Sequence, residues 1–299
     1  LASGIKDLLV EKSDLLFISN YSGDAHPGVL FTGVKMRLSI ILGRIATQTK
    51  HEAMIFSTKF IRWFTEARDY VFEDISYVEV EYPLFFNGLI PKVGLFEELS
   101  ILKKIFHQPK QLGAYESNHF TNSIYSHRIV AHFVKSFDFV PYFWNEKDGL
   151  KKSEDYKVFQ FKTSNEALIA NAILNSNTFY YFYILYSDAY HCGRELILGF
   201  PFALLNISPT HEKSLIRLNQ VLMGDMQNNS VRRKIKYRTG WIEYDEFYPR
   251  LSKSIIDRID QCLAEHYDFS PQELDFIVNY DIKYRMGDNL FEDEEGDEA

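Results

Sequence analysis

Clusters of Lys and Arg set among aromatic residues are the part of this sequence best suited to chemistry. The densest run is Arg-Arg-Lys-Ile-Lys-Tyr-Arg at 232–238, and a second segment combines Tyr125 with His127 and Arg128. Lys and Arg neutralise phosphates by displacing counterions, while Arg, His and Tyr can contact bases or phosphates. These residues indicate a nucleic-acid surface, with a solvated surface of mixed charge as the alternative. The candidate contacts are Lys35, Arg37, Tyr125, His127, Arg128, Lys151, Lys152, Arg194, Arg232, Arg233, Lys234, Lys236 and Arg238.

The overall charge of the chain hides an asymmetry. The formal net charge is -8 over 299 residues, which by itself argues against a polyanionic partner. Acidic residues concentrate after residue 240, however, so residues 1–240 carry a net positive charge. Local charge, rather than the total, governs docking to phosphates. The sequence therefore allows a body that faces DNA, followed by an acidic end, and we expect residues 288–299 to form a disordered tail.

Metal and disulfide chemistry are not indicated. His127 and His132 are five residues apart, and no Cys or carboxylate stands in ligand register beside them, so we expect no metal site. The two cysteines, Cys192 and Cys262, suit a reducing compartment. The sequence shows no signal peptide and no apolar run of about 20 residues. We therefore expect a cytoplasmic protein without a membrane partner, and a chain that opens in mid-pattern at Leu1 as a piece of a longer one.

A long aromatic segment, residues 165–202, is expected to hold the candidate side chains in place. Its first part has apolar residues at helical spacing, and residues 179–185 are apolar or aromatic at every position. A helix that is apolar all round is a buried helix. The polar sequence Asn175-Ser176-Asn177 should separate the two helices, and a loop carrying His191 and Arg194 follows them.

The remaining elements follow from periodicity and capping residues. Apolar runs predict strands at 15–18, 34–43 and 53–56, and alternation predicts more within 118–143. Helical spacing predicts helices over 60–72 and 95–106. Ser208-Pro209 begins another helix that ends near Asn228. Ser270 to Glu273 is a capping box for a later helix, for which Gly287 is the expected C-cap.

Several of these segments resemble the C-terminal half of type II or IIG-like N6-adenine DNA methyltransferases of restriction-modification systems. Residues 30–41, Leu-Phe-Thr-Gly-Val-Lys-Met-Arg-Leu-Ser-Ile-Ile, are similar to the last strand hairpin of the methyltransferase domain. Residues 165–202 resemble the scaffold of the target-recognition region. The most specific match is at the end: Phe247-Tyr248-Pro249, Ser-Lys-Ser-Ile-Ile-Asp at 252–257, and Glu-Leu-Asp-Phe-Ile-Val-Asn-Tyr-Asp-Ile-Lys-Tyr-Arg-Met-Gly at 273–287.

The resemblance implies an α+β chain in four parts. Residues 1–78 would be the C-terminal end of the α/β methyltransferase catalytic domain, and residues 79–204 a mixed α/β target-recognition domain with an aromatic helical core. Residues 205–287 would form a C-terminal helical brace before the acidic tail. The implied partners are double-stranded DNA and the upstream catalytic domain of the same parent protein, whose cofactor would be S-adenosylmethionine.

The catalytic motifs of that family are missing from this sequence. It contains no Pro-Pro dipeptide and no Gly-x-Gly, whereas the family holds its flipped adenine with an Asn/Asp-Pro-Pro-aromatic motif. We therefore expect this chain to bind no cofactor and to be inactive alone. Two alternatives remain open: a stand-alone DNA-specificity module that pairs with a separate methylase, and an α+β domain that binds no nucleic acid. The last is favoured if Arg128, Arg194 and the 232–238 run point to different faces.

Overall fold

The computed structural model describes residues 3–23, 29–34, 36–47 and 53–286. The chain divides into two compact units, Leu1–Phe106 with Ile184–Asp188, and His107–Tyr183 with Ala189–Ala299. Each unit combines helices with strands, so the expected mixture of α and β structure is confirmed. Within the described ranges, no helix has the length and apolar character needed to cross a bilayer.

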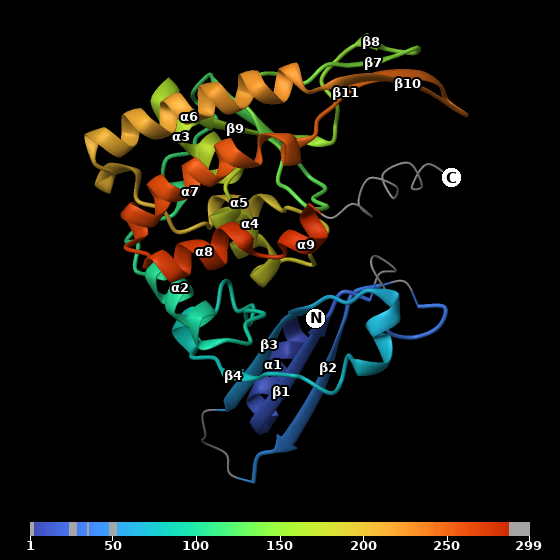
Figure 1. The fold of residues 1–299 in the computed structure, drawn as a ribbon, viewed down its shortest axis with the longest axis vertical. Helices are drawn as coiled ribbons and strands as arrows, with labels where there is room; N and C mark the ends of the chain where they lie inside the picture. The colour runs from blue at the N-terminus through green and yellow to red at the C-terminus, as the bar shows by residue number, and fades with distance from the viewer. Residues whose placement is uncertain (1–2, 24–28, 35, 48–52, 287–299) are drawn as a thin grey trace. The chain divides into compact units, whose positions relative to one another are not determined.

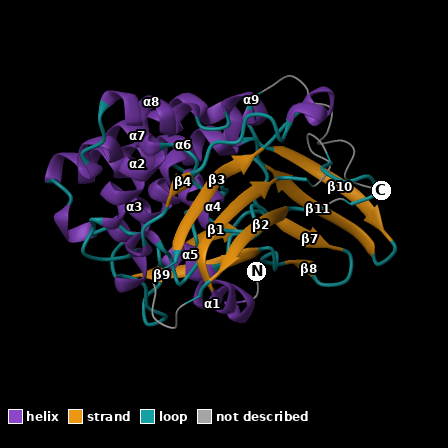
Figure 2. Ribbon diagram, turned by 90° about the horizontal axis from the view of Figure 1, so that it is seen from below, coloured by secondary structure: helices purple, strands orange, loops and turns teal. Residues whose placement is uncertain are grey.

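The first unit is built on a mixed four-stranded sheet with the order β2-β1-β3-β4. Strand β1 pairs antiparallel with β2 and parallel with β3, and β4 pairs antiparallel with β3. Figure 2 shows β1, β2 and β3 as neighbouring arrows. The elements are α1 (Ser3–Lys12), β1 (Ser13–Tyr21), β2 (Leu38–Ile45), β3 (Met54–Ile61) and β4 (Val78–Glu79).

The three strands expected in this unit are confirmed, but the helix expected over 60–72 is wrong. Phe60 and Ile61 complete β3, where Ile61 pairs with Tyr21 of β1. Only a short 3-10 helix, Thr65–Tyr70, follows. The side chains of Tyr21 and Trp63 are buried together, so tertiary packing on the sheet overrides the helical spacing of this segment.

The first unit also takes in α2 (Phe96–Phe106) and the end of α4 (Asn177–Tyr186). The buried Nζ of Lys92 lies 2.9 Å from the Ile184 carbonyl oxygen, 3.2 Å from that of Leu185 and 2.6 Å from that of Ser187. Lys92 thereby satisfies carbonyls at the helix end that have no partner within the helix. The first compact unit extends to Phe106, and the domain boundary after residue 78 that the resemblance implies stays a prediction.

The second unit contains a helical layer around the aromatic helix α4 (Figure 1). Helix α3 packs against α6, and α6 packs against α7. The expected break at Asn175-Ser176-Asn177 and the expected capping box at Ser270 and Glu273 are confirmed, whereas Gly287 and residues 288–299 lie outside the described residues. The helices are α3 (Ser164–Leu174), α5 (Arg194–Leu198), α6 (Pro209–Asn228), α7 (Lys253–Tyr267), α8 (Pro271–Asn279) and α9 (Ile282–Arg285).

A buried carboxylate fixes the start of α4. Asp260 of α7 is fully buried and accepts hydrogen bonds from the backbone N–H groups of Asn177 and Thr178, at 3.0 and 2.8 Å. It also accepts from the Thr178 hydroxyl and the Asn177 side-chain amide, each at 2.7 Å. The helix N-terminus is therefore capped by a residue from another helix.

Two antiparallel sheets complete the second unit, with orders β6-β5-β9 and β10-β11-β7-β8. They meet where the ring of Phe137 packs 4.4 Å from that of Phe247. Figure 1 shows β10 and β11 reaching away from the helices of this unit. The strands are β5 (Asn122–His127), β6 (Ser136–Phe137), β7 (Phe143–Asn145), β8 (Gly149–Leu150), β9 (Tyr156–Phe161), β10 (Val231–Tyr237) and β11 (Gly240–Glu246).

Candidate nucleic-acid interface

The basic run at 232–238 forms strand β10 and its turn rather than a loop. Strand β10 pairs with β11 along its whole length, from Val231 opposite Glu246 to Tyr237 opposite Gly240. The turn therefore consists of Arg238 and Thr239, and Gly240 accepts the positive φ of +120° that closes it. Because β10 is the edge of its sheet, its cations are exposed.

One face of the hairpin interleaves cations with aromatic rings. Alternation along β10 puts Arg232, Lys234 and Lys236 on the same face. The Arg232 guanidinium lies 3.5 Å from the ring centroid of Tyr142, and the Nζ atoms of Lys234 and Lys236 each lie 5.7 Å from that of Trp241. These are cation–π distances. The aromatic partners come from β11 and from the segment leading into β7, which the sequence pattern did not connect with the basic run.

Three cations of β10 are paired with carboxylates of β11. Arg232 Nε lies 2.5 Å from Asp245 Oδ1, and Lys234 Nζ lies 2.6 Å from Glu243 Oε1. On the opposite face, Arg233 Nε lies 2.6 Å from Glu246 Oε2. These cations are roughly half exposed, and exposed ion pairs contribute only about 0–1 kcal/mol. A phosphate can therefore compete with each carboxylate for its cation.

The tip of the hairpin, formed by the end of β10 and the turn, carries two cations without carboxylate partners among the described residues. In the part of the chain that the structure describes, no carboxylate oxygen lies within salt-bridge distance of Lys236 or Arg238. Beside them, Tyr237 and Trp241 are 51% and 37% exposed. The tip thus combines cations, which neutralise phosphates, with exposed aromatic rings, which stack on bases.

The candidate residues of β5 form a second group in the same unit. The ring of His127 lies 5.0 Å from that of Tyr156, and its Nδ1 lies 2.9 Å from the Ile129 carbonyl oxygen. Burial lowers the pKa of His127, so its imidazole is neutral at pH 7. Arg128 is exposed and its Nε lies 2.8 Å from Asp155 Oδ1. Tyr125 is half-buried on the same strand. Arg128 is thus the member best placed to reach a ligand.

Lys151, Lys152 and Arg194 are occupied by local contacts. Lys151 Nζ lies 2.9 Å from Asp148, and Lys152 Nζ donates to the carbonyl oxygen of Tyr156 at 3.0 Å. Arg194 donates to Glu116 at 2.5 Å and to a β9 carbonyl at 3.0 Å, with its guanidinium over the Phe159 ring. These contacts favour a structural role for Arg194.

The other two candidates are not part of this group. Arg37 belongs to the first unit, and Lys35 lies outside the described residues. The first unit has its own cavity of about 410 Å³, lined by Arg62, Trp63 and Asp74 among others. Its mixed lining indicates no one class of ligand.

A smaller cavity in the second unit lies against Tyr248, whose hydroxyl accepts a hydrogen bond from Arg233 Nη2 at 3.0 Å. It is lined partly by residues that the sequence pattern did not single out, Lys135 and Arg250, and by Arg285 of the C-terminal signature. Their separation of up to 150 positions in the sequence explains why only the fold could group them.

Neither a metal centre nor a known relative adds to this description. Among the residues that the structure places, no three His, Cys, Asp or Glu side chains form a group that could hold a metal ion. Comparison of the chain with protein families, curated proteins and solved structures found no match.

Proposed function

We propose that this chain is the DNA-binding, target-recognition part of an adenine-N6 DNA methyltransferase of a restriction-modification system. The observation that carries the proposal is the β10–β11 hairpin, whose tip presents Lys236 of β10 and Arg238 of the turn without carboxylate partners beside two exposed aromatic rings. The resemblance of residues 247–287 to the C-terminal signature of that family supports the enzyme class.

The dimensions of the hairpin suit a DNA groove. Seven residues at about 3.3 Å each make a strand of roughly 23 Å, and the major groove, about 12 Å wide, admits a two-stranded β-ribbon. In this proposal Lys236 and Arg238 bind backbone phosphates, and the paired cations Arg232, Arg233 and Lys234 exchange their carboxylates for phosphates on binding. Exposed ion pairs are weak enough to permit the exchange.

In this proposal, the residues at β5, chiefly Arg128, recognise the base sequence of the DNA. Arg128 is exposed at the end of β5, and Arg can donate two hydrogen bonds to guanine in the major groove. Its present partner, Asp155, is itself exposed, so the pair can open at little cost. Tyr125 and His127 would support this arginine from the same strand, whereas Arg194 braces β9.

The catalytic steps belong to residues outside this sequence. S-adenosylmethionine and the flipped adenine would be held by the upstream catalytic domain, and the chain presents DNA to that domain. Calorimetry with S-adenosylmethionine tests this division: we expect no saturable heat in the micromolar range. A micromolar site on this chain would show that the cofactor is held here.

The binding claim is tested by fluorescence anisotropy of a labelled 30-base-pair duplex with the 299-residue chain across a salt series. We expect binding that weakens steeply as salt increases, because each phosphate contact releases counterions. Absence of binding at low salt would favour the domain that binds no nucleic acid. Reading the codons upstream of Leu1 separates the other two possibilities, since only a methyltransferase parent encodes the Asn-Pro-Pro-Tyr type of motif there.

A further inference from the structure

Arg285 of α9 is a buried cation without a carboxylate partner. It is 2% exposed, and its guanidinium lies between the rings of Phe133 and Tyr180, at 4.1 and 4.2 Å from their centroids. Nε donates to the His132 carbonyl oxygen at 2.8 Å, and Nη1 to the Tyr280 carbonyl oxygen at 3.3 Å. In the described ranges, no carboxylate oxygen of an Asp or Glu lies within 4.0 Å of its guanidinium nitrogens.

Burying the charge of Arg285 without a nearby anion costs free energy. A buried charge normally has a counterion, because desolvation costs several kcal/mol per ion. Burial lowers the pKa of Arg285, and the acids that act on it, Asp260, Asp281 and Asp257, only offset that effect. Arginine keeps its proton under such conditions. These aspartates act from beyond salt-bridge distance, so an anion bound in the adjacent cavity would add a closer countercharge.

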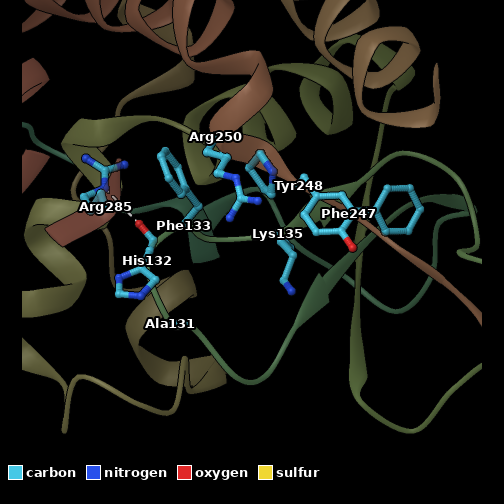
Figure 3. A pocket seen from close by; sticks show the side chains of 9 residues that line it. Ala131, His132, Phe133, Lys135, Phe247, Tyr248, Arg250 and Arg285 are labelled. Atoms are coloured by element: carbon cyan, nitrogen blue, oxygen red, sulfur yellow. Dashed lines mark hydrogen bonds between the residues drawn. The ribbon is translucent and has the colours of Figure 1, made fainter. Parts of the chain in front are cut away.

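Arg285 lines a small cavity together with other basic side chains. Figure 3 shows the Phe133 ring between Arg285 and Arg250, Lys135 nearer to the Tyr248 ring, and His132 below Arg285. The remaining lining residues are Ala131, Phe133, Phe247 and Pro249, so none of the lining side chains is acidic. The concentration of two arginines and a lysine around one cavity predicts an anion as its ligand.

The size of the cavity limits what the anion can be. Its volume is about 50 Å³, on a measure by which one water needs about 10–15 Å³. The cavity thus holds about three to five waters, roughly the space of a single phosphate group. The rest of a nucleotide would have to extend beyond this volume.

One carboxylate that interacts electrostatically with a lining residue of the cavity is Glu246. Lys135 contributes to lowering the pKa of this carboxyl, so the two groups attract each other. Glu246, however, is already bound by Arg233 and by the Tyr248 hydroxyl. Tyr248 connects the cavity to the basic hairpin, because it lines the cavity and accepts a hydrogen bond from Arg233.

We propose that the cavity formed by Arg285, Arg250 and Lys135 binds one phosphate group. Arginine guanidinium groups donate paired hydrogen bonds to phosphate oxygens, and the lysine adds a point charge. The proposal of an anion site stands by itself. Its assignment to a backbone phosphate of DNA, rather than to free phosphate, rests on the proposed function.

The first arm of the test uses inorganic phosphate with the full chain. We expect calorimetry at constant ionic strength to give a saturable site with a millimolar dissociation constant, and phosphate to raise the melting temperature. Arg250→Ala and Lys135→Ala should each weaken binding about tenfold. Arg217→Ala, an exposed arginine of α6, should bind as the wild type does. An equal response to acetate, or an unchanged affinity in both cavity variants, overturns the proposal.

Arg285→Met extends the first arm to the buried cation. Replacing a buried charge by an apolar side chain of similar length can leave stability unchanged, so this variant should fold and lose the stabilisation by phosphate. If Arg285→Met does not fold, Arg250→Ala and Lys135→Ala decide the outcome by themselves, because both side chains are partly exposed.

The second arm identifies the source of the phosphate. A duplex that displaces inorganic phosphate, and whose affinity falls in Arg250→Ala, makes the occupant a backbone phosphate. A duplex that binds without displacing phosphate supports a site for free phosphate. Failure of the wild-type chain to bind any duplex would overturn the proposed function while leaving the phosphate measurement intact, so the two failures are distinguishable.

Discussion

Arg232 of β10 and Asp245 of β11 form an ion pair across the hairpin, with 2.5 Å between Nε and Oδ1. The same guanidinium lies 3.5 Å from the centre of the Tyr142 ring. The arginine is therefore held in a fixed position while its charge is balanced by a neighbour on the next strand. The basic run is partly neutralised by its own hairpin, and its attraction for a polyanion is smaller than the sequence alone indicates.

Removing the charge of Asp245 is expected to strengthen DNA binding. In Asp245→Asn, Arg232 no longer has to give up a carboxylate, so the affinity for a duplex at low salt should rise about three- to tenfold, the effect of roughly one favourable charge contact. Asp275→Asn, an exposed residue of α8, makes the same change in net charge and should shift affinity by less than twofold. Equal effects of the two variants would mean that only the total charge matters.

Asp260 is expected to be essential for stability. Asp260→Ala leaves the N–H groups of Asn177 and Thr178 and the Thr178 hydroxyl without their acceptor, whereas the Asn177 side-chain amide keeps Asp257. Because each buried donor that loses its partner costs about 1–3 kcal/mol, the free energy of unfolding should fall by about 3 kcal/mol or more in urea titrations. Asp275→Ala should change it by no more than about 0.5 kcal/mol. A similar value for the two variants would contradict the capping role.

His266 of α7 is expected to make the protein less stable in mild acid. Burial, together with the nearby His211, lowers the pKa of His266 to about 4, against about 6.5 in an unfolded chain. Between these values the unfolded chain binds a proton that the folded chain excludes. The free energy of unfolding should therefore fall as the pH decreases from about 6.5 towards 4.

Urea unfolding at pH 7 and pH 5 checks the role of His266. His266→Phe keeps an aromatic ring against Phe202, whose ring lies 4.4 Å away, and it cannot titrate. The loss of stability between the two pH values should be smaller in this variant than in the wild type. His119→Gln, at an exposed position, serves as the control and should retain the wild-type dependence. An unchanged pH dependence in His266→Phe would assign the acid sensitivity to other groups.

Local signals in the sequence predicted many of the elements. The uniformly apolar residues 179–185 form a buried helix, and the capping box at Ser270 and Glu273 is present with both hydrogen bonds. These features depend on neighbours a few positions apart, which the sequence displays directly. The prediction of a helix over residues 60–72 was wrong because Phe60 and Ile61 pair with a strand about 40 residues earlier. Helical spacing carries no information about that partner.

The candidate site was predicted only in part for the same reason. The run at 232–238 was visible as basic, but its pairing with Glu243, Asp245 and Glu246 depends on the hairpin register. The sequence contains one signal of this pairing: acidic residues follow the basic run after a short turn, at positions that lie opposite the cations in an antiparallel hairpin. The grouping of Arg250 with Lys135 and Arg285 had no such signal, because the three residues line one cavity from segments that are far apart in the sequence.

The salt dependence of duplex binding by a hairpin-turn variant tests the central claim most directly. Lys236→Ala combined with Arg238→Ala removes the two cations that lack carboxylate partners, and each lost phosphate contact lowers the slope of log K against log salt by about 0.9. We predict a slope smaller by about 1.8 and weaker binding to every duplex sequence. Lys213→Ala combined with Arg217→Ala, an equal loss of charge on α6, should leave the slope unchanged. An unchanged affinity and slope in the hairpin variant would contradict DNA binding through the β10–β11 hairpin.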